Sequence, residues 1–275
     1  MVTKTSFSAD IETMKVWLFL PFLCLALVAA LFAKPLVPAV HVAGGTFLQG
    51  LRTLDPPDPG RSVTVSSFWM GTTEVTQQQY QALTNANPSW FKGPLKPVES
   101  VSWFDAVAFC NLLSDHDGLR HAYAIEDGRV SWDPTSPGWR LPTEAEWEFA
   151  ARGGTHPWRK DFPGNDAVEE VAWDYYNSSK QTHNVGALKP NELGLFDLAG
   201  NVWEWCWDWY EFDRSDLPPK DPRGPLVGSS RVSRGGAWNE DHTDAFRPYY
   251  RADDGPETKG NNLGFRVVRN DQTTP

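Results

Sequence analysis

The segment between residues 231 and 268 is the most informative part of this sequence. It contains RVSRGGAWNEDHTDAFRPYYR over residues 231–251 and NLGFRVV over residues 262–268. The paired glycines Gly235-Gly236 break any regular element, because glycine readily adopts backbone conformations that other residues avoid. Acidic residues are interleaved with aromatic ones between Trp238 and Gly260. The C-terminal part of the chain is therefore expected to consist of loops and short strands.

The composition of the whole chain supports this expectation. Its 275 residues include 14 Trp, 15 Phe and 7 Tyr, with 22 Gly and 22 Pro. So much Gly and Pro implies short helices and many loops, while 40% hydrophobic residues suffice for a core. A net charge of −10 argues against nucleic acid or anionic lipid as a partner and is consistent with a soluble acidic surface.

An apolar segment near the N-terminus stands apart from the rest of the chain. Residues 16–33 carry no charge and are flanked by Lys15 and Lys34. This run suits either a cleaved signal peptide or a retained membrane anchor, and translation could start at Met1 or Met14. Either way we expect an exported protein, periplasmic or on the cell surface, that meets the membrane only through this segment. We therefore expect a leader or anchor over residues 1–34, a linker over 35–40, one domain over 41–270 and a tail over 271–275.

Turn and cap residues indicate the first elements of the domain. Residues 42–50 are expected to form a strand with a glycine break and residues 63–70 its partner, with 55–60 as the turn. Three helix starts carry a hydroxyl three residues before a polar acceptor, as in a capping box: Thr76, Ser102 and Thr143. No long periodic segment follows Gly153-Gly154.

Only two cysteines lie beyond the leader, Cys110 and Cys206. They could form one disulfide or remain buried thiols. We expect burial, because each lies in an aromatic-rich run and free cysteine packs as a small hydrophobe.

Several sequence blocks together resemble the formylglycine-generating enzyme, or sulfatase-modifying factor, domain family. They follow one another in order from His41 to Asn270: GGTF (44–47), EVT (74–76), PV (97–98), VSW (101–103), RLPTEAEWE (140–148), ARGG (151–154), GLFD (194–197), GNVWEW (200–205), RGG (234–236) and LGFR (263–266). The resemblance implies a single compact α+β domain, a variant of the C-type lectin fold, with little regular structure and Trp-rich loops.

The copper-dependent activity of this family depends on particular reactive residues, which can be sought in this sequence. The oxidases of this family bind copper through two cysteines, because soft Cu(I) prefers thiolate ligands. In this chain Glu240 and Ala245 occupy the positions of these cysteines. Ala237 occupies the position of a serine that assists catalysis in the oxidases. Copper is therefore not expected. The iron-dependent branch would need histidines on a second helical domain, and the six histidines show no ligand spacing. No catalytic residue is assigned.

The resemblance also implies a structural calcium site. Its ligands would be the side chains of Asp197 and Glu204 with the carbonyl oxygens of Gly200 and Val202. Oxygen donors in a glycine-containing loop suit a hard cation such as Ca²⁺. Alternatively, the two carboxylates serve only to cap turns.

Acidic and aromatic residues of the C-terminal loops are candidates for ligand binding, since aromatic groups supply contact area and carboxylates supply polar specificity. They could equally form a solvated loop, with Phe246 and Tyr250 expected in the core. This segment is also the one that retroelements diversify in some ligand-binding members of the family. The candidate residues are Trp238, Asn239, Glu240, Asp241, His242, Asp244, Tyr249, Asp253 and Asp254.

These observations favour an exported module that binds a protein or small-molecule ligand through its C-terminal loops. One alternative is a divergent oxidoreductase of the formylglycine-generating type that acts on a sulfatase cysteine. Another is an accessory subunit of a bacterial envelope assembly.

Overall fold

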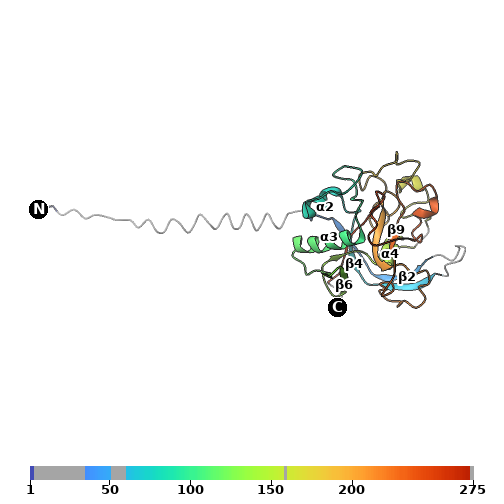
Figure 1. Ribbon diagram of the computed structural model, residues 1–275, viewed down its shortest axis with the longest axis horizontal. Helices are drawn as coiled ribbons and strands as arrows, with labels where there is room; N and C mark the ends of the chain where they lie inside the picture. The colour runs from blue at the N-terminus through green and yellow to red at the C-terminus, as the bar shows by residue number, and fades with distance from the viewer. Residues whose placement is uncertain (3–34, 51–59, 158–159, 273–275) are drawn as a thin grey trace. The chain divides into compact units, whose positions relative to one another are not determined.

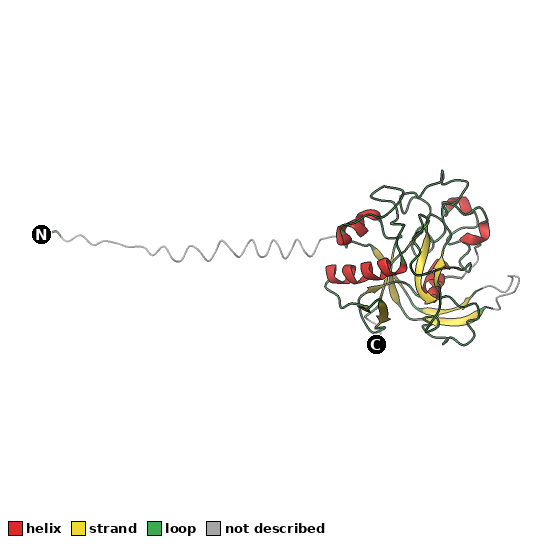
Figure 2. Ribbon diagram, in the orientation of Figure 1, coloured by secondary structure: helices red, strands yellow, loops and turns green. Residues whose placement is uncertain are grey.

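Short strands and connecting loops surround three helices in the folded part of the chain (Figure 1, Figure 2). The computed structural model describes residues 1–2, 35–50, 60–157 and 160–272. Contacts divide the chain into Met1–Leu36 and Val37–Pro275, and only the second unit is described below. Residues 55–59 of the expected turn and residues 3–34 of the leader lie outside the described residues.

The N-terminal part of the domain forms two broken strand pairs. β1 (Ala39–Val42) pairs with β4 (Phe68–Gly71), and β2 (Gly45–Gln49) pairs with β3 (Arg61–Val65). The predicted break occurs at Gly44, where a Cβ atom would lie 2.6 Å from the carbonyl oxygen of Val65. Only glycine permits so close an approach of two backbones.

Two four-stranded sheets bring distant segments together. The first has the order β1-β4-β12-β7 and the second the order β10-β9-β8-β11, in which β11 pairs parallel to β8. A separate hairpin joins β5 and β6. The remaining strands are β5 (Tyr123–Glu126), β6 (Arg129–Trp132), β7 (Trp139–Arg140), β8 (Trp203–Trp209), β9 (Arg231–Arg234), β10 (Ala252–Asp254), β11 (Leu263–Gly264) and β12 (Val268–Asn270).

The three predicted helix starts are confirmed. Capping boxes at Thr76, Ser102 and Thr143 begin the helices α2 (Gln77–Thr84), α3 (Trp103–His116) and α4 (Glu144–Ala151). In each, the hydroxyl accepts the third backbone N–H of the helix, which removes an unsatisfied donor. After α4 the described regular structure consists of short strands and the 3-10 turns η2 (Val168–Glu170) and η3 (Thr243–Phe246).

Helix α4 is buried on all sides, next to β2 and β9 (Figure 1). Trp147 and Phe149 lie in the main core together with Cys206 and Val232. Cys110 and Cys206 are both buried free thiols, as the sequence predicted.

The charged residues of α4 bind arginines from the loops. Glu148 lies 2.6 Å from Arg234 and 2.8 Å from Arg152, while Glu144 binds Arg251. Although burial raises the pKa of Glu144, its arginine neighbours hold that pKa at about 2. Buried charges are tolerated only when they are paired in this way. These pairs therefore hold the loop-rich C-terminal half on the helix.

Part of the segment predicted as a linker, residues 35–40, belongs to the domain. β1 starts at Ala39, Val37 is buried, and the carbonyl oxygen of Pro38 accepts a hydrogen bond from Thr72 N–H. At the other end, Asp271 accepts a hydrogen bond from His41. The residues that directly precede β1 and follow β12 are thus hydrogen-bonded to the rest of the domain.

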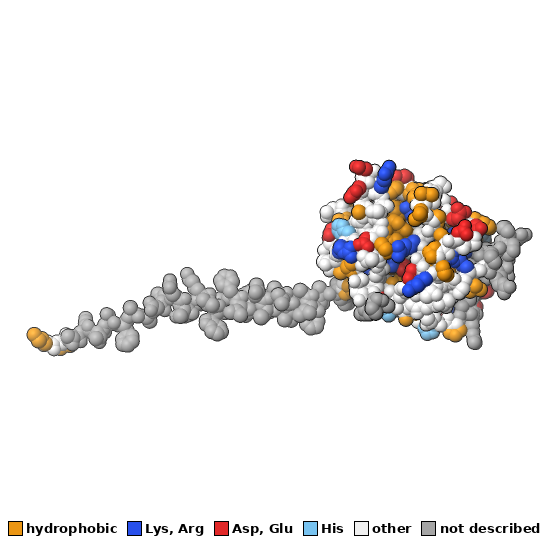
Figure 3. Space-filling model, turned by 90° about the horizontal axis from the view of Figure 1, so that it is seen from below, with side chains coloured by type: hydrophobic (Ala, Val, Ile, Leu, Met, Phe, Trp, Pro, Cys, Tyr) orange, Lys and Arg blue, Asp and Glu red, His pale blue; other side chains and the backbone are white. Residues whose placement is uncertain are grey.

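Positive and negative side chains are interspersed on the face shown in Figure 3, where no continuous basic surface is seen. Within the described residues, no helix has the length and apolar character needed to cross a membrane. The apolar run at 16–33 lies outside them.

Candidate functional site

The loop that follows β9 is shaped by two glycines and one buried ring. Gly235 and Gly236 have φ of 101° and 77°. A Cβ atom on Gly236 would lie 2.6 Å from Cδ1 of Phe246, so the ring packs directly on the backbone. Phe246 is 1% exposed, as expected for a core residue. The loop therefore leaves the core at Gly236 and returns to it at Phe246.

A cavity of about 290 Å³ opens beside this loop. Trp203, at the start of β8, and Tyr250 form aromatic walls, with ring centroids 6.1 Å apart. A volume of this size is near the lower end of the range for small-ligand pockets. The complete lining is Trp203, Glu240, His242, Tyr250, Ala252, Asp253, Asp254, Thr258, Gly260, Asn262 and Leu263.

Glu240 is held in place from several directions. Its Oε1 accepts a hydrogen bond of 3.0 Å from Trp203 Nε1, and its carbonyl oxygen accepts one from Tyr175 N–H. Its Oε2 lies 3.5 Å from Nδ1 of His242, whose Nε2 lies 3.4 Å from the Tyr250 hydroxyl. The Glu240 side chain is 21% exposed and that of His242 is 50% exposed. Glu240 thus presents a preorganised, partly desolvated carboxylate to the cavity.

Negative charge dominates the electrostatics of the cavity. Burial and the nearby Glu240 carboxylate raise the pKa of Tyr250, and burial and Asp253 raise the pKa of Asp254. Neither Lys nor Arg is among the described lining residues. The nearby Arg251 is bound to Glu144. The cavity is therefore an acidic, aromatic-walled site.

The structure brings only part of the predicted ligand surface into this cavity. Glu240, His242, Asp253 and Asp254 line it. The other predicted residues lie around it: Trp238 packs on Phe91 and donates to the Asn261 carbonyl, Asn239 accepts from Asn262, Asp241 is exposed, Asp244 binds Arg247, and Tyr249 is half-buried.

One expectation for this region was wrong, and one contributor was not foreseen. Tyr250 is half-buried and lines the cavity, although it was expected in the core. Its ring shares the wall with Trp203, which the sequence analysis assigned only to the fold. The concentration of Trp residues between 203 and 209 could have indicated a polar partner for Trp203, because tryptophan N–H groups usually find hydrogen-bond partners when buried.

Two of the three positions that carry reactive groups in the oxidases hold buried alanines, and the third is Glu240. Ala237 and Ala245 are both 0% exposed. The thiols of Cys110 and Cys206 are buried elsewhere in the core, and burial raises the pKa of each. A raised pKa disfavours the thiolate, which is the nucleophile and metal ligand.

The predicted calcium ligands lie in a second, buried region. Asp197 has φ of 55° and accepts a hydrogen bond of 2.7 Å from Gly186 N–H. Glu204 is bound through both oxygens to Arg266, at 2.6 Å each, and also accepts from Trp147 Nε1. A Cβ on Gly200 would lie 2.4 Å from the Trp173 carbonyl oxygen.

This region contains more carboxylates than cations. Glu74 lies beside Asn201, and burial together with Asp197 and Glu204 raises its pKa well above the ordinary value. Burial also raises the pKa of Asp197 to about 6. The excess negative charge fits a cation, whereas Arg266 already occupies both Glu204 oxygens. Among the described residues, no group of three or more His, Cys, Asp or Glu side chains is arranged to hold a metal.

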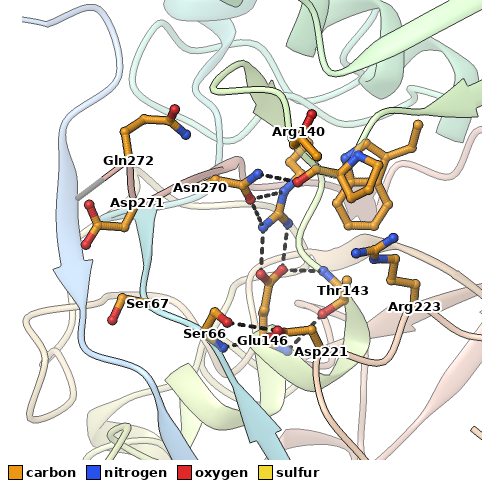
Figure 4. A pocket seen from close by; sticks show the side chains of 13 residues that line it. Ser66, Ser67, Arg140, Thr143, Glu146, Asp221, Arg223, Asn270, Asp271 and Gln272 are labelled. Atoms are coloured by element: carbon orange, nitrogen blue, oxygen red, sulfur yellow. Dashed lines mark hydrogen bonds and ion pairs between the residues drawn. The ribbon is translucent and has the colours of Figure 1, made fainter. Parts of the chain in front are cut away.

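A third region, a cavity of about 320 Å³, lies between β4, β12 and α4 (Figure 4). Its floor is a closed network in which Arg140 binds both oxygens of Glu146 at 2.6 Å and also Asn270. Asp221 accepts from the backbone and hydroxyl of Ser66. These groups are satisfied by one another, so the network explains local stability without a ligand.

The domain thus combines an α+β fold with a cavity that is built from its C-terminal loops. The sulfatase-modifying factor enzyme 1-like domain model matches residues 29–271, and the chain belongs to this family.

The chain is similar to proteins of differing activity. It is 35% identical over 262 residues to the chaperone protein LppX of Paenibacillus barcinonensis, covering 84% of this chain and 88% of that protein. It is 35% identical over 196 residues to the formylglycine-generating enzyme of Thermomonospora curvata, covering 64% of this chain and 56% of that enzyme. The structure of Treponema denticola variable protein 1 superimposes with a TM-score of 0.79 at 34% identity, covering 84% of this chain and 94% of that one.

Proposed function

We propose that this protein is an exported binding module that recognises a protein or small-molecule ligand through the cavity and loops around Glu240. The observation that carries the proposal is the Glu240 carboxylate, oriented by Trp203 and facing an aromatic-walled cavity. Partly desolvated polar groups beside aromatic surface are typical of ligand sites. The similarity to a protein named a chaperone supports a protein partner.

The alternative is a divergent oxidase. Glu240 and Ala245 stand where the oxidases carry cysteines, and carboxylate and methyl groups cannot replace two thiolates as Cu(I) ligands. The Cys110 and Cys206 thiols are fully buried. Copper-dependent turnover is therefore not expected.

Photo-crosslinking tests the binding function. A photoreactive amino acid replaces exposed Asn239 in the full-length chain, and Glu126, an exposed residue of β5 outside the site, serves as the matched control. A partner captured from position 239 and absent from position 126 is the expected result. Equal capture from both positions, or from neither, contradicts the proposal. Aldehyde formation on a Cys-x-Pro-x-Arg peptide with Cu(I) would instead establish the oxidase.

We further propose that Asp197, Gly200, Val202 and Glu204 hold a structural Ca²⁺. The buried carboxylates of Glu74, Asp197 and Glu204 face one arginine, Arg266, so a divalent cation would balance the remaining charge. Ca²⁺ is expected to raise the unfolding temperature and a chelator to lower it, with the effect abolished by Asp197→Asn. If Ca²⁺ leaves the unfolding temperature of the wild type unchanged, the Glu204–Arg266 pair stabilises this region without a metal ion.

Export is part of the proposal. The uncharged run at residues 16–33 supports it, as does the similarity to LppX over most of both chains. Fractionation of cells that express the tagged full-length chain should place it in the envelope or the medium. Recovery in the cytosol contradicts export, and recovery in a constant membrane complex would favour the accessory-subunit alternative.

A further inference from the structure

The cavity beside Glu240 has an uncompensated charge. Three carboxylates line it, those of Glu240, Asp253 and Asp254, and its described lining contains neither Lys nor Arg. Some buried carboxylates of this domain are paired directly with arginines, as Glu148 is with Arg234 and Glu204 is with Arg266. This cavity differs from that pattern, and its position at the surface makes the carboxylates available to a ligand.

The walls of the cavity are aromatic. Trp203 is 8% exposed, and its ring lies beside that of Tyr250. The faces of Trp and Tyr rings carry negative electrostatic potential and attract cations within about 6 Å. Carboxylates and aromatic rings that line the same cavity form a site in which both kinds of group favour positive charge.

A group of the protein itself already occupies the position that such a ligand would take. The His242 ring lies 3.5 Å from Glu240 Oε2 and packs edge-on against Tyr250, with ring centroids 5.7 Å apart. Its side chain is half-exposed and its ring is able to carry a positive charge. The backbone of His242 precedes the short turn η3, and the two groups that contact its ring, Glu240 and Tyr250, are the ones that a ligand would meet. An incoming ligand can therefore replace it beside Glu240.

We propose that the cavity lined by Glu240, Trp203 and Tyr250 binds an organic cation, such as an amidinium or ammonium group, which displaces the His242 ring. This inference rests on the proposed binding function and specifies the chemistry of the ligand. A protein partner would provide the cation from one of its side chains.

Two probes of equal shape test the charge requirement. Benzamidinium is a planar cation, and benzamide is its neutral counterpart. Titration of the full-length chain, followed by calorimetry and by the nuclear magnetic resonance signal of Trp203, is expected to show benzamidinium binding at least ten-fold more tightly than benzamide. Equal affinity for the two probes, or no binding of benzamidinium, overturns the inference.

Three variants assign the effect to this cavity. Glu240→Gln keeps an oxygen that can accept the Trp203 N–H but removes the charge, and it is expected to weaken benzamidinium binding at least ten-fold. His242→Ala removes the competing ring and is expected to retain or strengthen binding. Glu126→Gln removes a carboxylate outside the site and should leave affinity unchanged. Circular dichroism confirms that each variant is folded.

The outcomes separate this inference from the proposed function. If the wild-type chain captures a partner from a photoreactive residue at position 239 but binds both probes alike, the binding module stands and the cation requirement is wrong. If the wild-type chain captures no partner and binds neither probe, both are wrong. A Glu126→Gln effect equal to that of Glu240→Gln would show nonspecific charge attraction and also overturn the inference.

Discussion

Both side-chain oxygens of Glu204 accept hydrogen bonds of 2.6 Å from Arg266, and both residues are 0% exposed. The pair joins β8, which begins with the cavity residue Trp203, to the chain that follows β11. A buried pair of this kind is costly to break because the remaining charge has no water to solvate it.

Arg266→Met is accordingly expected to lower the free energy of unfolding by about 3–5 kcal/mol. The double variant Glu204→Gln/Arg266→Met removes the charge of both partners and should recover part of this loss. Urea denaturation in the presence of a chelator measures both. A single variant within about 1 kcal/mol of wild type would show that the pair is not the main connection.

Stability is expected to fall as pH rises from about 5 to 8. Burial, followed by Glu144, raises the pKa of Asp208 to about 7, against an ordinary value of 3.8. A raised carboxyl pKa means that the folded state holds a proton that the unfolded state releases, so this contribution is present at low pH and lost as pH passes 7. Between pH 5 and the folded pKa of about 7, the upper bound of this loss is on the order of 3 kcal/mol.

Urea midpoints at pH 5 and pH 8 measure this change. Asp208→Asn keeps an oxygen that can accept the Glu144 N–H and should flatten the pH dependence. At acid pH the opposite sign applies to Glu144, whose pKa is held at about 2 by its arginines, so its contribution disappears as pH falls from about 4.5 through 2. A variant that keeps the full alkaline loss would assign the effect to another group.

Cys110 and Cys206 are expected to resist thiol reagents in the folded state and to react once urea unfolds the chain. Their side chains are 0% exposed and burial raises the pKa of both thiols. Labelling is counted by mass spectrometry in a Cys24→Ser background, which removes the leader thiol. Rapid labelling of either residue under native conditions would contradict the expected burial.

Gly236→Ala is expected to destabilise the domain by about 1–3 kcal/mol. Its φ of 77° disfavours side chains, and the new Cβ would overlap the Phe246 ring. Gly118→Ala is the matched control, because Gly118 has φ of 67° with no atom within 4 Å of the added Cβ. Thermal unfolding of the two variants separates ring overlap from backbone strain, and equal losses would show that Phe246 is not the cause.

Local patterns predicted the features that depend on neighbouring residues. Each of the three capping boxes needs only a hydroxyl and an acceptor three residues apart, so Thr76, Ser102 and Thr143 could be recognised directly. The blocks from GGTF to LGFR carried the family and therefore the α+β fold.

Long-range pairs could not be predicted in this way. Glu148 and Arg234 are separated by 86 residues, and Glu204 and Arg266 by 62, so nothing local indicates which carboxylate meets which arginine. The same reason explains why Trp203 was not assigned to the candidate site with Glu240. Tyr250 was misplaced because a half-buried tyrosine, apolar at one end and wet at the other, resembles a core residue in sequence.

Arg234 donates to the carbonyl oxygen of Tyr250 and to Glu148, and it is 0% exposed. One side chain thus closes the two ends of the segment between it and Tyr250 and attaches both to α4. The span of this loop is consequently independent of the residues at its exposed tip, Asp241 to Asp244. Protein engineers could treat that tip as an exchangeable cassette, in which a library of new sequences would alter recognition while the frame beneath it continues to fold.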